Sequence, residues 1–347
     1  MFTNIKKLFV PVLVSIFSLT LFFTAYSPAF LQGTAVAVPQ EPLQVQAPPA
    51  SAALQQEASF SEYQLQVEID LHNRGDNQAS NIRLEVPLLG NLDSPYQVMV
   101  QENYSIEPVE VIEEAMGSRT ALFTIDSLPA GESKTITLLY GLEARPLAAV
   151  SSSFADVTLT EYLEPSRGLE SDHPSIISRA GEITSNSSSD KEQARKIYAF
   201  VLDHMTYDAE SPHRNQGALN ALEHGIGVCE DYASLFVALA RAADLPARQV
   251  NGYADPKATG EIWKLAPGQA FSLQGYRHSW AEVYLEGEGW LPLDPTMDIY
   301  NDSGSFKFFG SLPASSHIAQ NYEDNSIRAR FQGGQLAVTW SESLIGR

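Results

Sequence analysis

The hydrophobic pattern of this chain changes period near residue 165, and this change constrains the fold more than any other feature of the sequence. Before it, apolar and polar residues alternate, which is typical of strands with one buried face. After it, apolar residues recur at helical spacing before strand-like runs return. At 347 residues the chain is long enough for two cores, so the pattern predicts two domains of different architecture.

Residues 58–146 contain several short alternating runs and no helical segment. Turn signals at residues 73–77 and 129–132 separate these runs, which is the order expected of a β-sandwich. We therefore predict an all-β domain of immunoglobulin-like size that folds independently and contributes no catalytic residue. It contains no cysteine, so no disulfide joins its sheets.

Residues 165–300 begin with helical patterns and continue with mostly antiparallel strand patterns. Helices followed by strands predict an α+β domain. Residues 301–347 contain further strand-like pieces, which we expect to extend the sheet of this second domain.

The N-terminal segment has the organisation of an export signal. Lys6 and Lys7 precede an uncharged apolar run at residues 8–23, and the next charged residue is Glu41. This pattern predicts that residues 1–37 are a signal peptide or an uncleaved membrane anchor. Residues 38–57 are rich in Pro, Gln and Ala, as in a linker. The folded domains are therefore expected in the cell envelope or outside the cell.

The charge balance excludes some partners. The chain has 42 Asp and Glu residues against 22 Lys and Arg residues, a formal net charge of −20. Nucleic acid binding needs Lys and Arg to replace the counterions of the phosphates, so we expect no nucleic acid partner. The same excess argues against docking of the folded domains on anionic lipid.

Cys229 is the only cysteine of the chain, so it cannot form an internal disulfide. It lies where the glycines at positions 225 and 227 give way to a helical pattern, which places it at a helix N-terminus. The partial positive charge of a first helical turn stabilises a thiolate. The amide of Cys229 is also suited to donate to an oxyanion. These features favour a nucleophile over an inert core thiol.

His278 begins one predicted strand and Asp294 ends the next, with a turn at residues 287–289 between them. An antiparallel hairpin of this length brings its two ends side by side, so Asp294 can accept a hydrogen bond from His278. The other imidazole nitrogen is left for Cys229. We therefore predict a catalytic triad of Cys229, His278 and Asp294.

Two nearby residues are alternatives for these roles. His224 lies five residues before Cys229 and is an alternative base, although it is close in the chain for a partner across the fold. Asp231 is an alternative orienting carboxylate, but its position favours capping of the first helical turn. Taken alone, His278 is better explained as a core histidine, and Asp294 can simply start a turn.

Four motifs in order resemble the transglutaminase-like superfamily, and in particular its bacterial exported members. They lie within residues 175–300 and occupy residues 227–233 (Gly-Val-Cys-Glu-Asp-Tyr-Ala), 240–253, 278–284 (His-Ser-Trp-Ala-Glu-Val-Tyr) and 289–296 (Gly-Trp-Leu-Pro-Leu-Asp-Pro-Thr). The resemblance implies a papain-like α+β core preceded by the sandwich, with Cys229, His278 and Asp294 as its triad and no cofactor or metal. Calcium dependence occurs in animal transglutaminases, but the sequence has no EF-hand loop.

The triad and the resemblance imply a cysteine-dependent acyl-transfer enzyme that forms a thioester from an amide of a protein or peptide in the cell envelope. Water as the acceptor gives peptide hydrolysis, which we favour because the bacterial members of the superfamily look more often proteolytic. A lysine amine as the acceptor gives transglutaminase-type cross-linking. A cell-surface binding or assembly module with a vestigial active site is the alternative from another class, and the intact triad disfavours it. The sequence makes no prediction of the oligomeric state.

Overall fold

The computed structural model describes most of the chain after residue 60. The described segments are residues 61–90, 97–113, 117–144, 159–257, 263–299, 306–312, 316–322 and 327–347. All of them lie within one compact unit, Gln55–Arg347. The expected signal or anchor segment (1–37) and linker (38–57) lie outside the described residues. No helix in the described segments has the length and apolarity needed to cross a membrane.

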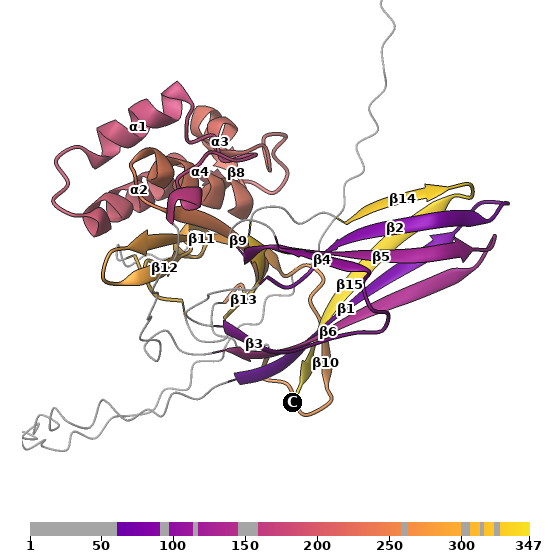
Figure 1. Ribbon diagram of the computed structural model, residues 1–347. Helices are drawn as coiled ribbons and strands as arrows, with labels where there is room; N and C mark the ends of the chain where they lie inside the picture. The colour runs from indigo at the N-terminus through magenta and orange to yellow at the C-terminus, as the bar shows by residue number, and fades with distance from the viewer. Residues whose placement is uncertain are drawn as a thin grey trace, which may run out of the picture. The chain divides into compact units, whose positions relative to one another are not determined.

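Two sheets make up the β-rich part of the chain (Figure 1). The five-stranded sheet has the order β10-β15-β1-β6-β3, and the four-stranded sheet the order β14-β2-β5-β4. The strands are β1 (Ser61–Asn73), β2 (Ala79–Pro87), β3 (Gln97–Tyr104), β4 (Glu110–Glu113), β5 (Arg119–Leu128), β6 (Ser133–Ala144), β10 (Ala270–Ser272), β14 (Arg328–Gln332) and β15 (Leu336–Gly346).

The alternating pattern of these strands explains how the two sheets share one core. Leu65 and Ile69 of β1 are fully buried together with Leu84 of β2 and Phe123 of β5, which belong to the other sheet. Side chains on successive strand residues point to opposite faces, so every second residue enters the core. The predicted all-β region is therefore present.

The C-terminal strands correct the expected domain boundaries. β15 pairs with β1 along its length, from Tyr63 opposite Gly346 to Asn73 opposite Leu336. β14 pairs with β2, and Figure 1 shows both yellow C-terminal strands among the indigo N-terminal ones. Residues 327–347 therefore complete the β-rich part instead of extending the second sheet, and residues 58–146 are not self-contained. Local alternation identifies a strand, but long-range contacts select its partner.

The second part of the chain places helices before a sheet, the predicted α+β order. Its sheet has the order β12-β11-β9-β13, so within residues 301–347 β13 does extend it as expected. The elements are α1 (Pro174–Thr184), α2 (Asp190–His204), β7 (Thr206–Tyr207), α3 (Ala218–His224), β8 (Ile226–Gly227), α4 (Cys229–Ala242), β9 (Ala247–Ala254), β11 (Arg277–Leu285), β12 (Gly289–Leu293), α5 (Pro295–Asp298) and β13 (His317–Tyr322), with a short 3₁₀ helix, η3 (Leu159–Tyr162).

Helix α4 is the centre of this part. It contacts α1, α2 and α3 as well as β9 and β11, and its residues 231–241 are all buried. A helix covered on all sides is apolar around its whole circumference, as the run Leu235–Ala240 is in this helix. This packing fixes the N-terminal end of α4 relative to the sheet.

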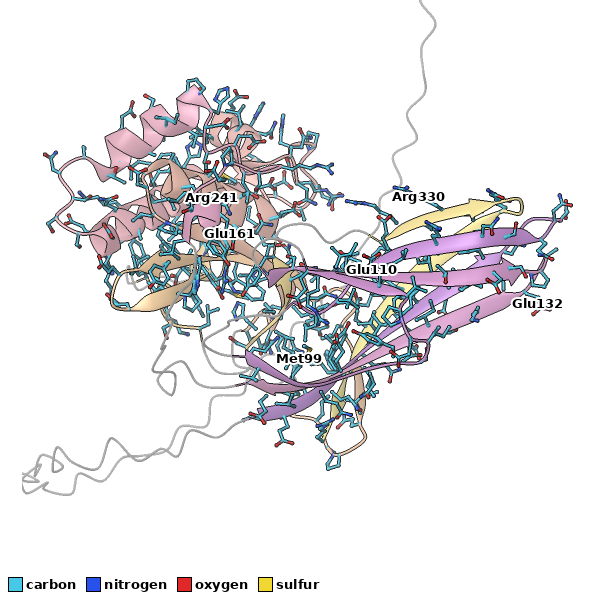
Figure 2. The ribbon with its side chains drawn as sticks, viewed as in Figure 1. Met99, Glu110, Glu132, Glu161, Arg241 and Arg330 are labelled. Carbon is cyan, nitrogen blue, oxygen red and sulfur yellow. The ribbon has the colours of Figure 1, made fainter. Side chains whose placement is uncertain are left out.

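Arg241 anchors the other end of α4, in the helical part of the molecule (Figure 2). Its side chain is buried. Its Nε donates to the carbonyl of Ala247 at 2.9 Å, and its Nη1 donates to the carbonyl of Glu164 at 2.7 Å. A cation in the last helical turn also complements the partial negative charge of the helix end. Arg241 therefore joins the C-terminus of α4 to the start of β9.

Candidate active site

Cys229 is the first residue of α4, as the glycine-to-helix transition predicts, and it is partly exposed. Asp231 accepts from the amide of Val228 at 2.8 Å and from the amide of Asn215 at 3.0 Å. A Cβ at Gly227 would collide with the Asp231 side chain, so glycine is needed there. Asp231 therefore caps the helix that carries Cys229 and is not available to orient a histidine.

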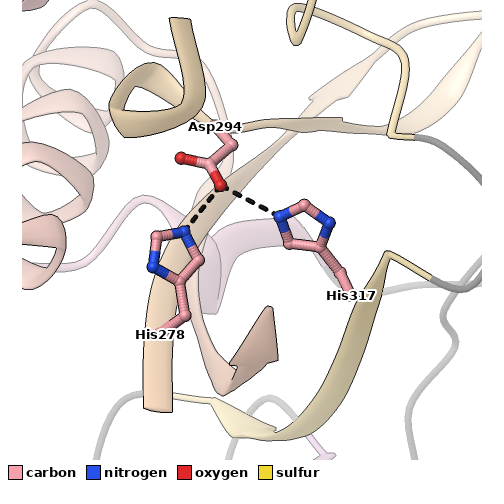
Figure 3. Close-up of side chains that lie close together, drawn as sticks. All are labelled: His278, Asp294 and His317. Atoms are coloured by element: carbon pink, nitrogen blue, oxygen red, sulfur yellow. Dashed lines mark hydrogen bonds and ion pairs between the residues drawn. The ribbon is translucent and has the colours of Figure 1, made fainter. Parts of the chain in front are cut away.

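His278 and Asp294 are brought together by the predicted hairpin. His278 lies on β11, and Asp294 follows β12 as the N-cap of α5. The two strands pair with Ala281 opposite Leu293, so both residues lie at the same end of the hairpin. The Nε2 of His278 is 2.6 Å from Oδ2 of Asp294 (Figure 3).

Asp294 is fully buried and accepts hydrogen bonds on both carboxylate oxygens. Oδ1 accepts from the hydroxyl of Thr296 at 2.6 Å and from the amide of Met297 at 3.3 Å. Oδ2 accepts from His278 and, at 2.9 Å, from Nε2 of His317. A buried charge is tolerated when it is paired and hydrogen-bonded in this way.

His317 is the residue that the sequence analysis missed. It is buried at the start of β13, which pairs with β9 with His317 opposite Ala254. Its Nδ1 lies 2.7 Å from the hydroxyl of Ser316, and Figure 3 shows its Nε2 directed at Asp294. The residue lies outside the four motifs, and only its polarity within the buried strand hints at a role.

Electrostatics define the charge of each group. Burial lowers the pKa of His278, but the Asp294 carboxylate and the neighbouring Cys229 outweigh burial and raise the pKa to about 10. Burial raises the pKa of Asp294, but His278 and His317 hold that pKa well below its usual range. Burial lowers the pKa of His317. At neutral pH the geometry thus holds an imidazolium at His278, a carboxylate at Asp294 and a neutral imidazole at His317.

The same three side chains offer ligand atoms within 4.8 Å of one another, as a metal site would. Two ligands of a tetrahedral zinc ion stand about 3.3 Å apart, given metal–ligand distances of about 2.0–2.1 Å. The contacts of Asp294 to His278 and to His317 are 2.6 and 2.9 Å. These are hydrogen-bond distances, so the cluster fits a hydrogen-bonded network better than a metal centre.

His224, the alternative base, lies on the surface of α3 and contacts other residues there. Its Nδ1 lies 3.1 Å from the carbonyl of Asn220, and its ring stacks on His213 with the centroids 3.8 Å apart. The structure pairs Asp294 with His278 instead, and Cys229 is among the groups that raise the pKa of the same imidazole. His278, and not His224, is therefore the histidine that the structure places beside Asp294.

A cavity of about 450 Å³ lies beside His278. Tyr207, Thr296 and Met297 are among the residues that line it. The cavity therefore adjoins the imidazole that bonds to Asp294.

Part of this chain resembles known proteins in sequence. Residues 177–295 match the sequence profile of the transglutaminase-like superfamily. An uncharacterised Bacillus subtilis protein, YebA, is 33% identical over 85 residues, which are 23% of this chain and 11% of that protein. The kyphoscoliosis peptidase of Mus musculus is 28% identical over 153 residues, 43% of this chain and 22% of that protein. Residues 177–295 therefore form a transglutaminase-like domain.

The chain spans only part of the curated relatives: 11%, 27% and 20% of the length of the first three. Among solved structures, a candidate cysteine protease from Cytophaga hutchinsonii is 17% identical with a TM-score of 0.49, covering 83% of this chain and 100% of that one. The periplasmic domain of TgpA from Pseudomonas aeruginosa is 16% identical with a TM-score of 0.37, covering 71% of this chain and 92% of that one.

Proposed function

We propose that the protein is an exported cysteine-dependent acyl-transfer enzyme that acts on amide bonds of proteins or peptides. The observation that carries this proposal is the position of His278, which contacts the Asp294 carboxylate at 2.6 Å and has its pKa raised by both Asp294 and Cys229. An imidazolium between a carboxylate and a thiolate is the ground state of a cysteine triad.

Each group then has a defined step. The Cys229 thiolate attacks the amide carbonyl, and the amide of Cys229 at the N-terminus of α4 donates to the developing oxyanion. The His278 imidazolium gives its proton to the leaving amine, which leaves a thioester on Cys229. Neutral His278 then takes a proton from the acceptor as it attacks the thioester. Asp294 stays ionised throughout and holds the imidazole in its orientation.

Peptide hydrolysis is the reaction we favour. The mouse relative is named as a peptidase, and hydrolysis needs only water as the acceptor. Cross-linking shares every step up to the thioester and differs in the acceptor, a lysine amine. The vestigial binding module is less favoured because the His278–Asp294 pair is intact.

Export and the architecture of the β-rich part belong to the same proposal. Lys6, Lys7 and the apolar run at residues 8–23 support a location in the cell envelope or outside the cell. The two sheets around one core support a sandwich of the immunoglobulin-like type.

The test is a peptide library incubated with the full chain, with and without a fluorescent primary amine, and analysed by mass spectrometry. We expect cleaved peptides in both conditions with the wild type and none with Cys229→Ala. Incorporation of the amine without cleavage would favour cross-linking instead. A thiol that reacts with no amide-mimicking electrophile would leave only the binding-module alternative.

A further inference from the structure

The described lining of the cavity beside His278 is cationic, although the protein is strongly acidic. Lys257, Arg277 and Lys307 are among its lining residues, and none of the lining residues within the described segments is an Asp or Glu. The chain as a whole carries 42 acidic residues against 22 basic ones. Among the lining residues that the structure describes, three cations without a carboxylate are therefore a local reversal of the charge of the molecule.

The two lysines keep their charge available. Both side chains are exposed. The neighbouring carboxylates are directed elsewhere: Asp255 accepts from the amide of Lys257 at 2.9 Å, and Asp298 accepts from the amide of Lys307 at 3.1 Å. Within the described part of the chain neither ammonium group forms an ion pair, whereas the Lys307 ammonium lies 5.1 Å from the ring centroid of Phe308.

Arg277 differs from the lysines because it has a partner. Its guanidinium forms an ion pair with Glu342 of β15, which is 7% exposed. A paired arginine adds less to the field of the cavity than an unpaired lysine does. The attraction for an anion therefore comes mainly from Lys257 and Lys307.

We infer that this cavity binds acidic side chains of a peptide substrate, with a carboxylate between Lys257 and Lys307 while the scissile amide reaches Cys229. This inference rests on the proposed function and names its substrate class. The aromatic walls at Tyr207, Tyr276 and Phe308 can cover the apolar stems of such side chains. Screening confines the effect to about 8 Å at physiological salt, so the cavity selects acidic segments although the rest of the surface repels them.

The charge of the cavity can be measured without a substrate. Iodoacetate and iodoacetamide alkylate the same thiol, but only iodoacetate is anionic. We expect Lys257→Glu and Lys307→Glu each to lower the iodoacetate-to-iodoacetamide rate ratio at Cys229 at least fivefold, with the iodoacetamide rate within about twofold of the wild type. Lys134→Glu, an exposed residue on β6, changes the net charge equally and should leave the ratio unchanged. An equal change in all three variants would show that only net charge matters and would overturn the inference.

Binding of the acidic peptide itself is tested by protection. Hexaglutamate should slow alkylation of Cys229 by iodoacetamide in the wild type, hexaglutamine should not, and Lys307→Glu should abolish the difference. Equal protection by both peptides, or by neither, would overturn the inference. Protection by hexaglutamate without cleavage of any library peptide would instead leave the acidic-peptide site standing and refute the proposed hydrolysis. Cleavage of library peptides without any preference for Glu over Gln would instead leave the proposed hydrolysis standing and refute the acidic-peptide site.

Discussion

His317 donates to Asp294 through Nε2 at 2.9 Å, and both side chains are almost completely buried. The oxygen that accepts is Oδ2, which also accepts from His278. Because Asp294 is ionised, it can only accept, so the hydrogen of His317 lies on Nε2 and its Nδ1 accepts from Ser316. His317 therefore fixes the direction of the carboxylate that orients His278.

His317 is thus expected to be a positioning residue. His317→Leu removes the donor and should lower kcat roughly 10-fold to 100-fold with little change in KM, because the cavity beside His278 is untouched. His317→Gln can still donate and should recover most of the activity. The pH profile of kcat should change in the Leu variant only. If the Leu and Gln variants lose activity and thermal stability equally, His317 only fills space.

The His278–Asp294 pair should make stability depend on pH within a defined window. The pKa of His278 is raised from 6.5 to about 10, so its contribution is full below pH 6.5 and is lost as the pH rises through 10. The pKa of Asp294 is lowered from 3.8, so its contribution is present above pH 3.8 and is lost as the pH falls further. Both contributions are complete between about pH 4 and 6.5.

The variant Asp294→Asn checks this window by thermal unfolding between pH 3 and 10. We expect the difference in Tm between wild type and variant to be largest from pH 4 to 6.5 and to shrink on either side. Asp203→Asn, at an exposed position of α2, is the control and should give a small difference at every pH. A difference that does not vary with pH would show that the pair is not ionised as described.

The pairing of β15 with β1 predicts that the C-terminus is required for folding. A chain that ends at Gln335 lacks an interior strand of the five-stranded sheet and leaves β1 with one neighbour. We expect it to lose cooperative unfolding by circular dichroism. Leu344→Ala, at a fully buried position of β15, should cost about 2–5 kcal/mol. The matched control is an alanine substitution at Trp340, an exposed position of the same strand. An unaltered Tm for the truncated chain would contradict this topology.

Arg248 and Glu282 form a buried ion pair between β9 and β11, with Nη2 and Oε2 2.6 Å apart. The guanidinium also lies 4.0 Å from the ring centroids of Trp290 and Tyr322. Glu282→Gln removes the charged partner of a buried cation and should cost about 3–5 kcal/mol in urea unfolding. The double variant Arg248→Met/Glu282→Leu should be less destabilised than Glu282→Gln. Additive losses would show that the two residues act independently.

Local sequence patterns predicted the elements that carry Cys229, His278 and Asp294. Glycines before a helical pattern identified the N-terminus of α4, and two strands around a glycine turn identified the hairpin. These relationships span few residues, so short-range rules are sufficient to describe them. The charge pattern did not predict the cationic cavity, because its lysines lie 50 residues apart in an acidic chain.

Sequence patterns did not predict the pairing of strands that lie far apart in the chain. His317 enters the site because β13 pairs with β9, more than 60 residues earlier in the chain. Gly252 permits this approach, since a Cβ there would collide with the carbonyl of Ile318. An alternating pattern does not indicate which strand pairs with it. The sequence analysis therefore assigned β15 to the wrong sheet and did not consider His317.

The most direct test of the central claim is the pH dependence of Cys229 alkylation by iodoacetamide in three proteins. In the wild type the thiol should react as part of an ion pair with His278. In His278→Ala we expect the midpoint of the profile to move towards about pH 8.5, as for a free thiol, with the rate at pH 6 reduced at least tenfold. His224→Ala, on the surface of α3, should match the wild type. A wild-type profile in His278→Ala, or a shifted one in His224→Ala, would contradict the triad of Cys229, His278 and Asp294.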